Sequence, residues 1–118
     1  MRSMFILRTT TKESRTVNHR KRRPTHPGAI LREDVLPETG ITQAQLAEIL
    51  GVSRRTVSEI LHEHRPVTTD MAHRLARVFN TTPAFWLRLQ EALDIWDTFE
   101  ARRGEYIRIR PLETANSR

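Results

Sequence analysis

The stretch LAEILGVSRRTVSEIL, residues 46–61, constrains the fold of this chain more than any other feature. Two short apolar-periodic runs flank Gly51, and each follows a residue that favours a helix N-terminus. Thr42 with Gln45 three positions later forms a capping-box pattern, and Ser53 is a second N-cap candidate. Gly51 suits the left-handed conformation that ends a helix tightly. The sequence therefore predicts two short helices joined by a tight turn.

The two predicted helices differ in the side chains that they leave exposed. The side of the first helix that is expected to be buried consists of Leu46, Ala47, Ile49 and Leu50. In the second helix, a rotation of about 100° per residue predicts that Val57, Ile60 and Leu61 face a core. The opposite side is polar and consists of Arg55, Ser58, Glu59 and His62, with Arg54 and Thr56 beside it in the first turn.

The segments on either side of this stretch also carry helical patterns. Pro27 suits the first position of a helix, and apolar residues recur at helical spacing until Pro37 and Gly40, which are expected to end it. Thr68 precedes another periodic segment, and a last helix is predicted to start near Thr82. The last helix has an apolar stripe that is expected to be core: Phe85, Trp86, Leu89, Ala92, Leu93, Trp96 and Phe99. The chain is therefore predicted to be all-α.

A helix with one apolar and one basic, polar face suits a DNA groove. Arginine pairs with guanine through two hydrogen bonds in the major groove, and serine or threonine contacts bases or phosphates. The residues predicted to read bases are Arg54, Arg55, Ser58 and Glu59. Those predicted to contact the DNA backbone are Thr42, Ser53, Thr56, His62, Arg65, Thr68 and Thr69. The alternative is a solvated face with an Arg55–Glu59 ion pair and threonines that only cap their helix.

The linked blocks around this motif resemble a known family. TQAQLAEILGVSRRTVSEIL is similar to the helix-turn-helix of the lambda repressor and Cro (XRE) family at Gln43, Ala47, Gly51, Val57 and Ile60. HPGAILREDVL precedes it and RPVTTDMAHRLARVFNTTPAFWLRLQEALDIW follows it. These blocks extend the resemblance, from Pro24 to Trp96, to the HigA (VapI-type) antitoxins.

This resemblance implies a five-helix, lambda-repressor-like domain that binds, as a homodimer, a palindromic operator of double-stranded DNA in its own promoter. It also implies a partner, a HigB-type toxin of the RelE-like ribosome-dependent mRNA endonucleases, which the antitoxin neutralises by direct binding. Gln43 resembles the family's phosphate-contacting glutamine. Leu87 and Ile95 lie on a second face of the last helix and are predicted to form the dimer interface, although isolated exposed apolar residues are also common.

Charge divides the chain into an arm, a domain and a tail. Residues 1–26 contain eight Lys or Arg and one acid, whereas the other 92 residues contain twelve basic and thirteen acidic side chains. We expect a disordered basic arm at 1–23, a helix-turn-helix domain at 24–103 with its motif at 42–63 and a C-terminal dimerisation helix, and a tail at 104–118. The arm is either a solvated leader or a segment that follows the DNA backbone or minor groove.

The tail carries a period of two rather than a helical period. Tyr106, Arg108 and Arg110 alternate with Ile107 and Ile109. This alternation predicts a short β-strand, which would pair with a dimer mate, with a toxin sheet edge or with nothing.

Several classes of function are disfavoured. The chain has no cysteine, which excludes disulfides, thiolate metal sites and cysteine nucleophiles. No apolar stretch approaches the roughly 20 residues needed to span a bilayer, and the N-terminus lacks a signal-peptide layout, so we expect a cytoplasmic protein without membrane contact. His62, Glu63 and His64 point to different sides of a helix, and Asp94 and Asp97 have no adjoining base or nucleophile. We expect no enzyme activity, cofactor or metal.

The sequence thus favours a sequence-specific repressor that is the antitoxin of a HigBA-type module and represses its own operon. Two alternatives keep the same core: a toxin-neutralising or other interaction module that does not read DNA, and a solitary XRE-type regulator without a toxin. A small metal-dependent enzyme is the third alternative, and it requires a bound metal.

Overall fold

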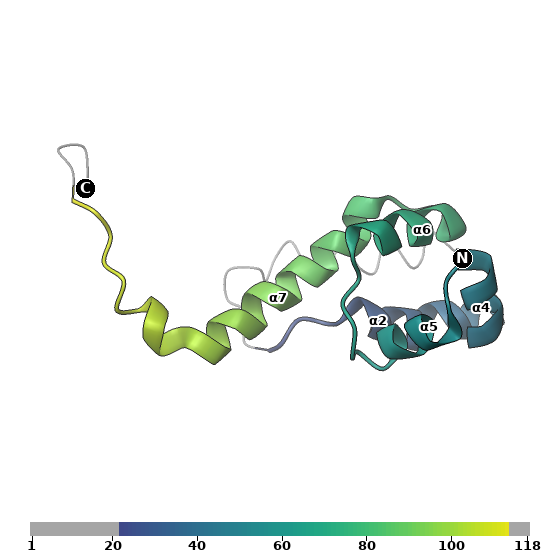
Figure 1. The fold of residues 1–118 in the computed structure, drawn as a ribbon, viewed down its shortest axis with the longest axis horizontal. Helices are drawn as coiled ribbons and strands as arrows, with labels where there is room; N and C mark the ends of the chain where they lie inside the picture. Colours follow the sequence, from purple (N-terminus) through teal and green to yellow (C-terminus); the bar gives the residue numbers. More distant parts are fainter. Residues whose placement is uncertain (1–21, 114–118) are drawn as a thin grey trace.

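The computed structural model describes residues 22–113 of the 118-residue chain. The helices are α2 (Pro27–Ile30), η2 (Leu31–Val35), α3 (Leu36–Thr39), α4 (Gln43–Leu50), α5 (Arg54–Leu61), α6 (Thr69–Phe79) and α7 (Pro83–Tyr106). Because α2, η2 and α3 are continuous, residues 22–113 form five helices, and the predicted all-α, five-helix fold is confirmed (Figure 1). Most of the predicted arm, residues 1–21, and the last residues of the tail, 114–118, lie outside the described residues.

The first helix passes through a proline because its middle turn is widened. The segment Leu31–Val35 is π-helical, and the Leu36 N–H donates to the Leu31 carbonyl five residues earlier. Pro37 follows immediately; in a regular α-helix its ring would press on the carbonyl one turn back, and the wider turn gives it room. The prediction that Pro37 helps to end this helix is therefore wrong. Gly40, with φ of 79°, ends it.

The predicted caps of the two central helices are confirmed. The Thr42 hydroxyl accepts from the Gln45 N–H at 3.1 Å, and the Gln45 side chain accepts from the Thr42 N–H at 2.9 Å. Gly51 is left-handed, with φ of 75°, and the Ser53 hydroxyl accepts from the Thr56 N–H at 3.1 Å. These local contacts fix both ends of the turn between α4 and α5.

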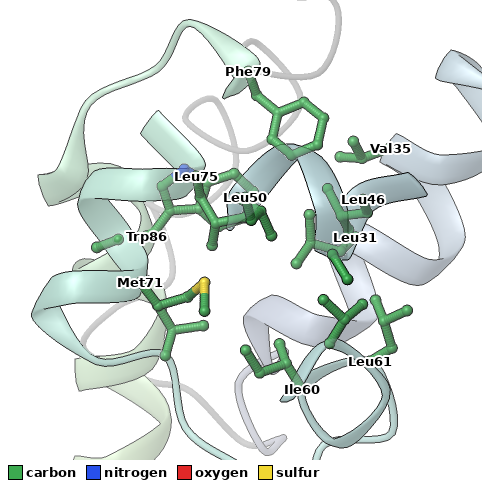
Figure 2. Packing of buried hydrophobic residues seen from close by; sticks show 14 residues of the cluster. Leu31, Val35, Leu46, Leu50, Ile60, Leu61, Met71, Leu75, Phe79 and Trp86 are labelled. Carbon is green, nitrogen blue, oxygen red and sulfur yellow. The ribbon is translucent and has the colours of Figure 1, made fainter. Parts of the chain in front are cut away.

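The core lies where the helices meet, and the apolar side of α5 faces it as predicted. Val57, Ile60 and Leu61 are each 3% exposed or less. Figure 2 shows side chains from all five helices converging on this core: Leu31, Val35, Leu46, Leu50, Ile60, Leu61, Met71, Leu75, Phe79 and Trp86. Trp86 is fully buried, and its indole N–H donates to the Thr81 hydroxyl at 2.8 Å, so its polar atom is satisfied.

Two residues that the periodicity assigned to the core are exposed. Ile49 is 54% exposed because it lies at the edge of the apolar arc of α4, beyond the side that neighbouring helices cover. Phe99 is 40% exposed because the C-terminal half of α7 projects away from the other helices (Figure 1). A helical period identifies a stripe, but the neighbouring elements decide how much of it is covered.

The start of the predicted tail is helical, not a strand. Helix α7 continues to Tyr106 with a kink at Arg102, where φ is −126° and ψ is 24°, and turns follow it within the described part of the chain. The Tyr106 ring stacks on Phe99 with 6.0 Å between centroids, and Arg103 lies over Phe99 at 5.2 Å. These contacts join the last turn of α7, beyond the kink, to the part before it, and they favour the helical turn over the alternating pattern.

Helix α2 approaches α5 so closely that one position tolerates only glycine. A Cβ atom on Gly28 would lie 1.8 Å from the Ile60 carbonyl oxygen and 2.8 Å from its carbon. Real side chains do not reach such distances, and the obstacle is backbone rather than a movable side chain. Gly28 therefore sets the distance between the first helix and the end of α5.

We predict that Gly28→Ala destabilises the domain by about 1–3 kcal/mol or more, because α2 and α5 must separate to admit the methyl group. Urea unfolding followed by circular dichroism measures this. Gly104→Ala is the matched control, since nothing lies within 4 Å of its Cβ position on α7. Equal stabilities for the two variants would contradict the close contact.

Candidate nucleic-acid interface

The residues predicted to read bases lie together on the outer face of α5. We define this outer face as Arg55, Ser58, Glu59 and His62, with Arg54 beside it in the first turn. The Arg55 side chain is 83% exposed, and Arg54 is also exposed. The opposite face of α5 is buried, so the helix is fixed on one side and open on the other.

Two arginines share the carboxylate of Glu59. Arg55 Nε lies 2.9 Å from Glu59 Oε2, and Arg65 Nε and Nη2 lie 2.9 and 2.7 Å from Glu59 Oε1. The hydrogen bond from Arg55, followed by that from Arg65, lowers the pKa of the Glu59 carboxyl, so it stays ionised. The Arg55–Glu59 ion pair that the sequence left as an alternative is present, and Arg65 is a further partner.

The hydroxyl residues predicted to contact the DNA backbone lie at helix N-termini and already cap them. Thr42, Ser53 and Thr68 cap α4, α5 and α6, and the Thr68 hydroxyl accepts from the Met71 N–H at 3.2 Å. The Thr56 hydroxyl lies 2.9 Å from that of Ser53. Gln43 and Thr69, the first residues of α4 and α6, are exposed. Capping and phosphate contact are compatible, since a capped N-terminus still presents N–H groups and a positive dipole.

Two arginines outside the motif hold the C-terminal ends of its helices. Arg74 of α6 donates to the Leu50 carbonyl at 2.8 Å, at the end of α4, and pairs with Asp70 at 2.9 Å. Arg32 of the first helix donates to the Leu61 carbonyl, at the end of α5. No local sequence pattern marks either role, because the partners lie 24 and 29 residues away along the chain.

The loop after α5 is tied to the start of the domain and to α7. Glu63 has a left-handed backbone, with φ of 64°, and accepts from Arg32 at 3.2 Å. Arg23 binds both oxygens of Asp97 at 2.8 and 2.9 Å, and this contact lowers the pKa of the Asp97 carboxyl. Gln90 of α7 accepts from the Val67 N–H at 2.9 Å. These contacts place Arg65 beside the end of α5.

Asp94 and Asp97, and His62 of the His62–Glu63–His64 run, contact other protein groups. Asp97 binds Arg23, and Asp94 accepts from Gln90 at 2.9 Å. His62 Nδ1 lies 2.8 Å from the Ser58 carbonyl oxygen. Within residues 22–113, no three or more His, Asp or Glu side chains are grouped so that they could hold a metal ion.

A buried histidine, which the sequence analysis did not single out, caps the first helix. His26 is 4% exposed, and its Nδ1 accepts from the Gly28 N–H at 2.8 Å. Burial lowers the pKa of His26 below its ordinary value of 6.5, with a smaller opposing effect from Glu63. Arg23 also lowers it, while Asp94 and the Arg65 backbone raise it. The neutral imidazole is the form that can accept this hydrogen bond.

The two residues predicted to form a dimer interface differ in exposure. Ile95 is 64% exposed, whereas Leu87 is partly buried and packs against the core.

Within residues 22–113, no helix is both long enough and apolar enough to cross a bilayer.

Comparisons with known proteins agree with this geometry. A family model described as Helix-turn-helix matches residues 31–86. An uncharacterized HTH-type transcriptional regulator of Haemophilus influenzae is 44% identical over 82 residues, which are 70% of this chain and 77% of that protein. Antitoxin HigA-1 of Vibrio cholerae is 40% identical over 92 residues, 78% of this chain and 87% of that protein. The solved structure of Pseudomonas aeruginosa antitoxin HigA with the higBA promoter is 41% identical, has a TM-score of 0.74, and covers 77% of this chain and 100% of its own.

We predict that stability falls on acidification in a way that depends on His26. Because the folded-state pKa lies below the unfolded-state value of about 6.5, the unfolded chain takes up the proton first as the pH falls. The contribution of neutral His26 is complete above this value and is lost as the pH falls through the folded-state pKa. Urea unfolding between about pH 7.5 and about pH 5.5 measures the decrease.

The matched variant for this prediction is His26→Asn, which retains an N-cap acceptor but does not titrate in this range. The decrease in the free energy of unfolding over this pH range should be smaller for the variant than for the unaltered chain. Identical pH dependence in the two proteins would show that His26 does not contribute.

Proposed function

Because this chain belongs to the helix-turn-helix family of the HigA antitoxins, we propose that it is a sequence-specific DNA-binding repressor and the antitoxin of a HigBA-type module. In this role it binds a palindromic operator in its own promoter as a homodimer. It also neutralises a RelE-like mRNA endonuclease toxin by direct binding. The Pseudomonas aeruginosa relative bound to the higBA promoter supports the first part, and the name of the Vibrio cholerae relative supports the second.

The observation that carries the DNA-binding proposal is the presentation of α5. One face of this helix is buried in the core, and the other offers Arg54, Arg55 and Ser58 to an acceptor outside the protein. Residues 27–118 contain twelve basic and thirteen acidic side chains, so net charge does not explain binding by the domain. Recognition therefore rests on the placement of particular arginines, and the basic arm at 1–23 adds affinity that is independent of sequence.

The DNA backbone is bound around this face by groups at helix ends. Gln43, Thr69 and Arg65 are exposed at the start of α4, at the start of α6 and in the loop after α5. The N–H groups of the first turns of α4, α5 and α6 point in the direction in which a phosphate would bind. These contacts fix the register of α5 in the groove without reading sequence.

The geometry of α7 supports the proposed dimerisation. This helix is 24 residues long and its C-terminal half projects from the domain (Figure 1). Ile95 is exposed on that half, and an uncovered apolar helix face suits a copy of itself related by a two-fold axis. Two copies would present α5 to half-sites about 34 Å apart.

Selection of bound duplexes from a random pool tests the DNA part of the proposal. The purified chain should enrich a two-fold symmetric motif with half-sites about one turn apart. Arg55→Ala should then weaken binding of that operator by about 1–3 kcal/mol and relax the preference at one base pair of each half-site, because the guanidinium is lost.

The control for this experiment is Arg77→Ala, which truncates an exposed arginine in the last turn of α6, outside both the outer face of α5 and the projecting part of α7. It should leave base preference unchanged. If Arg55→Ala kept the full discrimination of the unaltered chain, the assignment of the outer face of α5 to the groove would be refuted. Recovery of no motif, with only salt-sensitive retention of DNA, would favour an interaction module that does not read sequence.

Co-expression tests the toxin part. A HigB-type toxin encoded beside this chain should arrest growth of a bacterial host when it is expressed alone, and growth should recover when this chain is co-expressed. The two proteins should also elute together in size-exclusion chromatography. If growth stayed arrested and the two proteins eluted separately, the result would favour a solitary regulator without a toxin partner.

A further inference from the structure

We infer that Glu59 is a positioning residue that orients Arg55 and Arg65 for DNA, rather than a group that reads bases itself. This inference rests on the proposed function. The sequence pattern groups Glu59 with the arginines of α5 because all of them lie on its outer face. The contacts of its carboxylate point to a different role, which no pattern in the sequence predicts.

Both oxygens of the Glu59 carboxylate already accept hydrogen bonds from arginine. Oε2 accepts from Arg55 Nε and Oε1 accepts from Arg65 Nε, while Arg65 Nη2 lies 2.7 Å from Oε1. The Glu59 side chain is 28% exposed, against 83% for Arg55 and 45% for Arg65, so the carboxylate lies beneath the two guanidinium groups. A cytosine amino group would have to compete with these charged donors.

The contacts leave different parts of the two guanidinium groups available. Arg55 uses Nε alone, so in the described structure its terminal nitrogens Nη1 and Nη2 remain for a partner outside the protein. Two parallel N–H groups match guanine O6 and N7. Arg65 directs Nε and Nη2 toward the carboxylate, and its side chain is less exposed than that of Arg55 and lies beyond the end of α5. This placement favours base reading by Arg55 and backbone contact by Arg65.

The tertiary structure brings Arg65 to Glu59. The pair spans six residues and crosses the end of α5, so ordinary helix spacing does not produce it. The left-handed Glu63 turns the chain back, and Arg32 holds Glu63 and the Leu61 carbonyl. The loop is thereby fixed before DNA arrives, and less side-chain freedom is lost on binding.

Charge gives a second reason for the arrangement. An isolated carboxylate on this face would be repelled by the phosphates, whereas two arginines and one glutamate carry a net positive charge. Exposed ion pairs contribute little to folding, so removal of Glu59 should change DNA recognition more than stability.

Glu59→Gln tests this inference on the operator obtained by selection. The variant should lose roughly fivefold to tenfold of its preference for the operator over a duplex altered at the base pair that Arg55→Ala relaxes, because the guanidinium is no longer held in one orientation. Its affinity for unrelated duplexes should be unchanged or higher, since a negative charge has been removed. Thermal unfolding should be within a few degrees of the unaltered chain.

Glu100→Gln is the matched control, because Glu100 pairs with Arg103 at 3.1 Å on the projecting part of α7, and size-exclusion chromatography of the variant checks that its oligomeric state is that of the unaltered chain. It removes the same charge from a similar exposed pair and should leave base preference unchanged. In the double variant Arg55→Ala, Glu59→Gln, the second substitution should cause no further loss of preference at that base pair, because the residue that it orients is absent.

Two results would overturn the inference. If Glu59→Gln altered the preference at a different base pair, and did so equally in the Arg55→Ala background, Glu59 would read a base itself. If it raised affinity for every duplex without loss of discrimination, Glu59 would act only through its charge. Failure of the unaltered chain to select any motif would instead refute the proposed function.

Discussion

The contact between Gly28 and the carbonyl of Ile60 is the constraint on which the placement of α5 depends. Helix α5 has only eight residues, and a helix of that length is not stable by itself in water. It is held by its buried side and by the first helix, whose backbone comes so close that a Cβ atom would lie 1.8 Å from the Ile60 oxygen. The end of α5 therefore rests on backbone, which does not yield as a side chain would.

The C-terminal ends of α4 and α5 are also held by groups from other parts of the chain, because the motif itself offers no partner for their last carbonyls. The last carbonyls of a helix lack partners within it and carry a partial negative charge. Here Arg74 from α6 binds the carbonyl at the end of α4, and Arg32 from the first helix binds the one at the end of α5. Both motif helices are thus fixed by positive groups from outside the motif. On the outer face of α5, the side-chain contacts are those of Glu59 with its arginines and those of His62 with Ser58.

The charge distribution explains how a domain without excess positive charge can serve as a DNA-binding module. Several of its acids contact an arginine, among them Glu59, Glu63 and Asp97. The arginines in these pairs keep their positive charge while their orientation is restricted. Under the proposed function, the placement of charge rather than its quantity distinguishes one DNA sequence from another, and the basic arm is proposed to attract any DNA.

The sequence by itself determined the features that depend on neighbours along the chain. The Thr42–Gln45 capping box, the Ser53 cap, the left-handed Gly51 and the buried side of α5 all follow from contacts within one or two turns. Such contacts leave a direct pattern in the residues. Together with the helical periods of the other segments, they were sufficient to predict an all-α chain and to place Arg55, Ser58 and Glu59 on one face of α5, with Arg54 beside it.

Only the tertiary structure decided what depends on distant partners. The helical period could not show that α7 extends beyond the core and leaves Phe99 exposed. It also could not show that a π-helical turn allows the first helix to continue through Pro37. Nor could it show that Glu59 holds Arg65 as well as Arg55, because the loop conformation that joins them depends on Arg32 and Glu63. The physical reason is that coverage and long-range hydrogen bonds are properties of how helices meet, and a period along one helix carries no information about its neighbours.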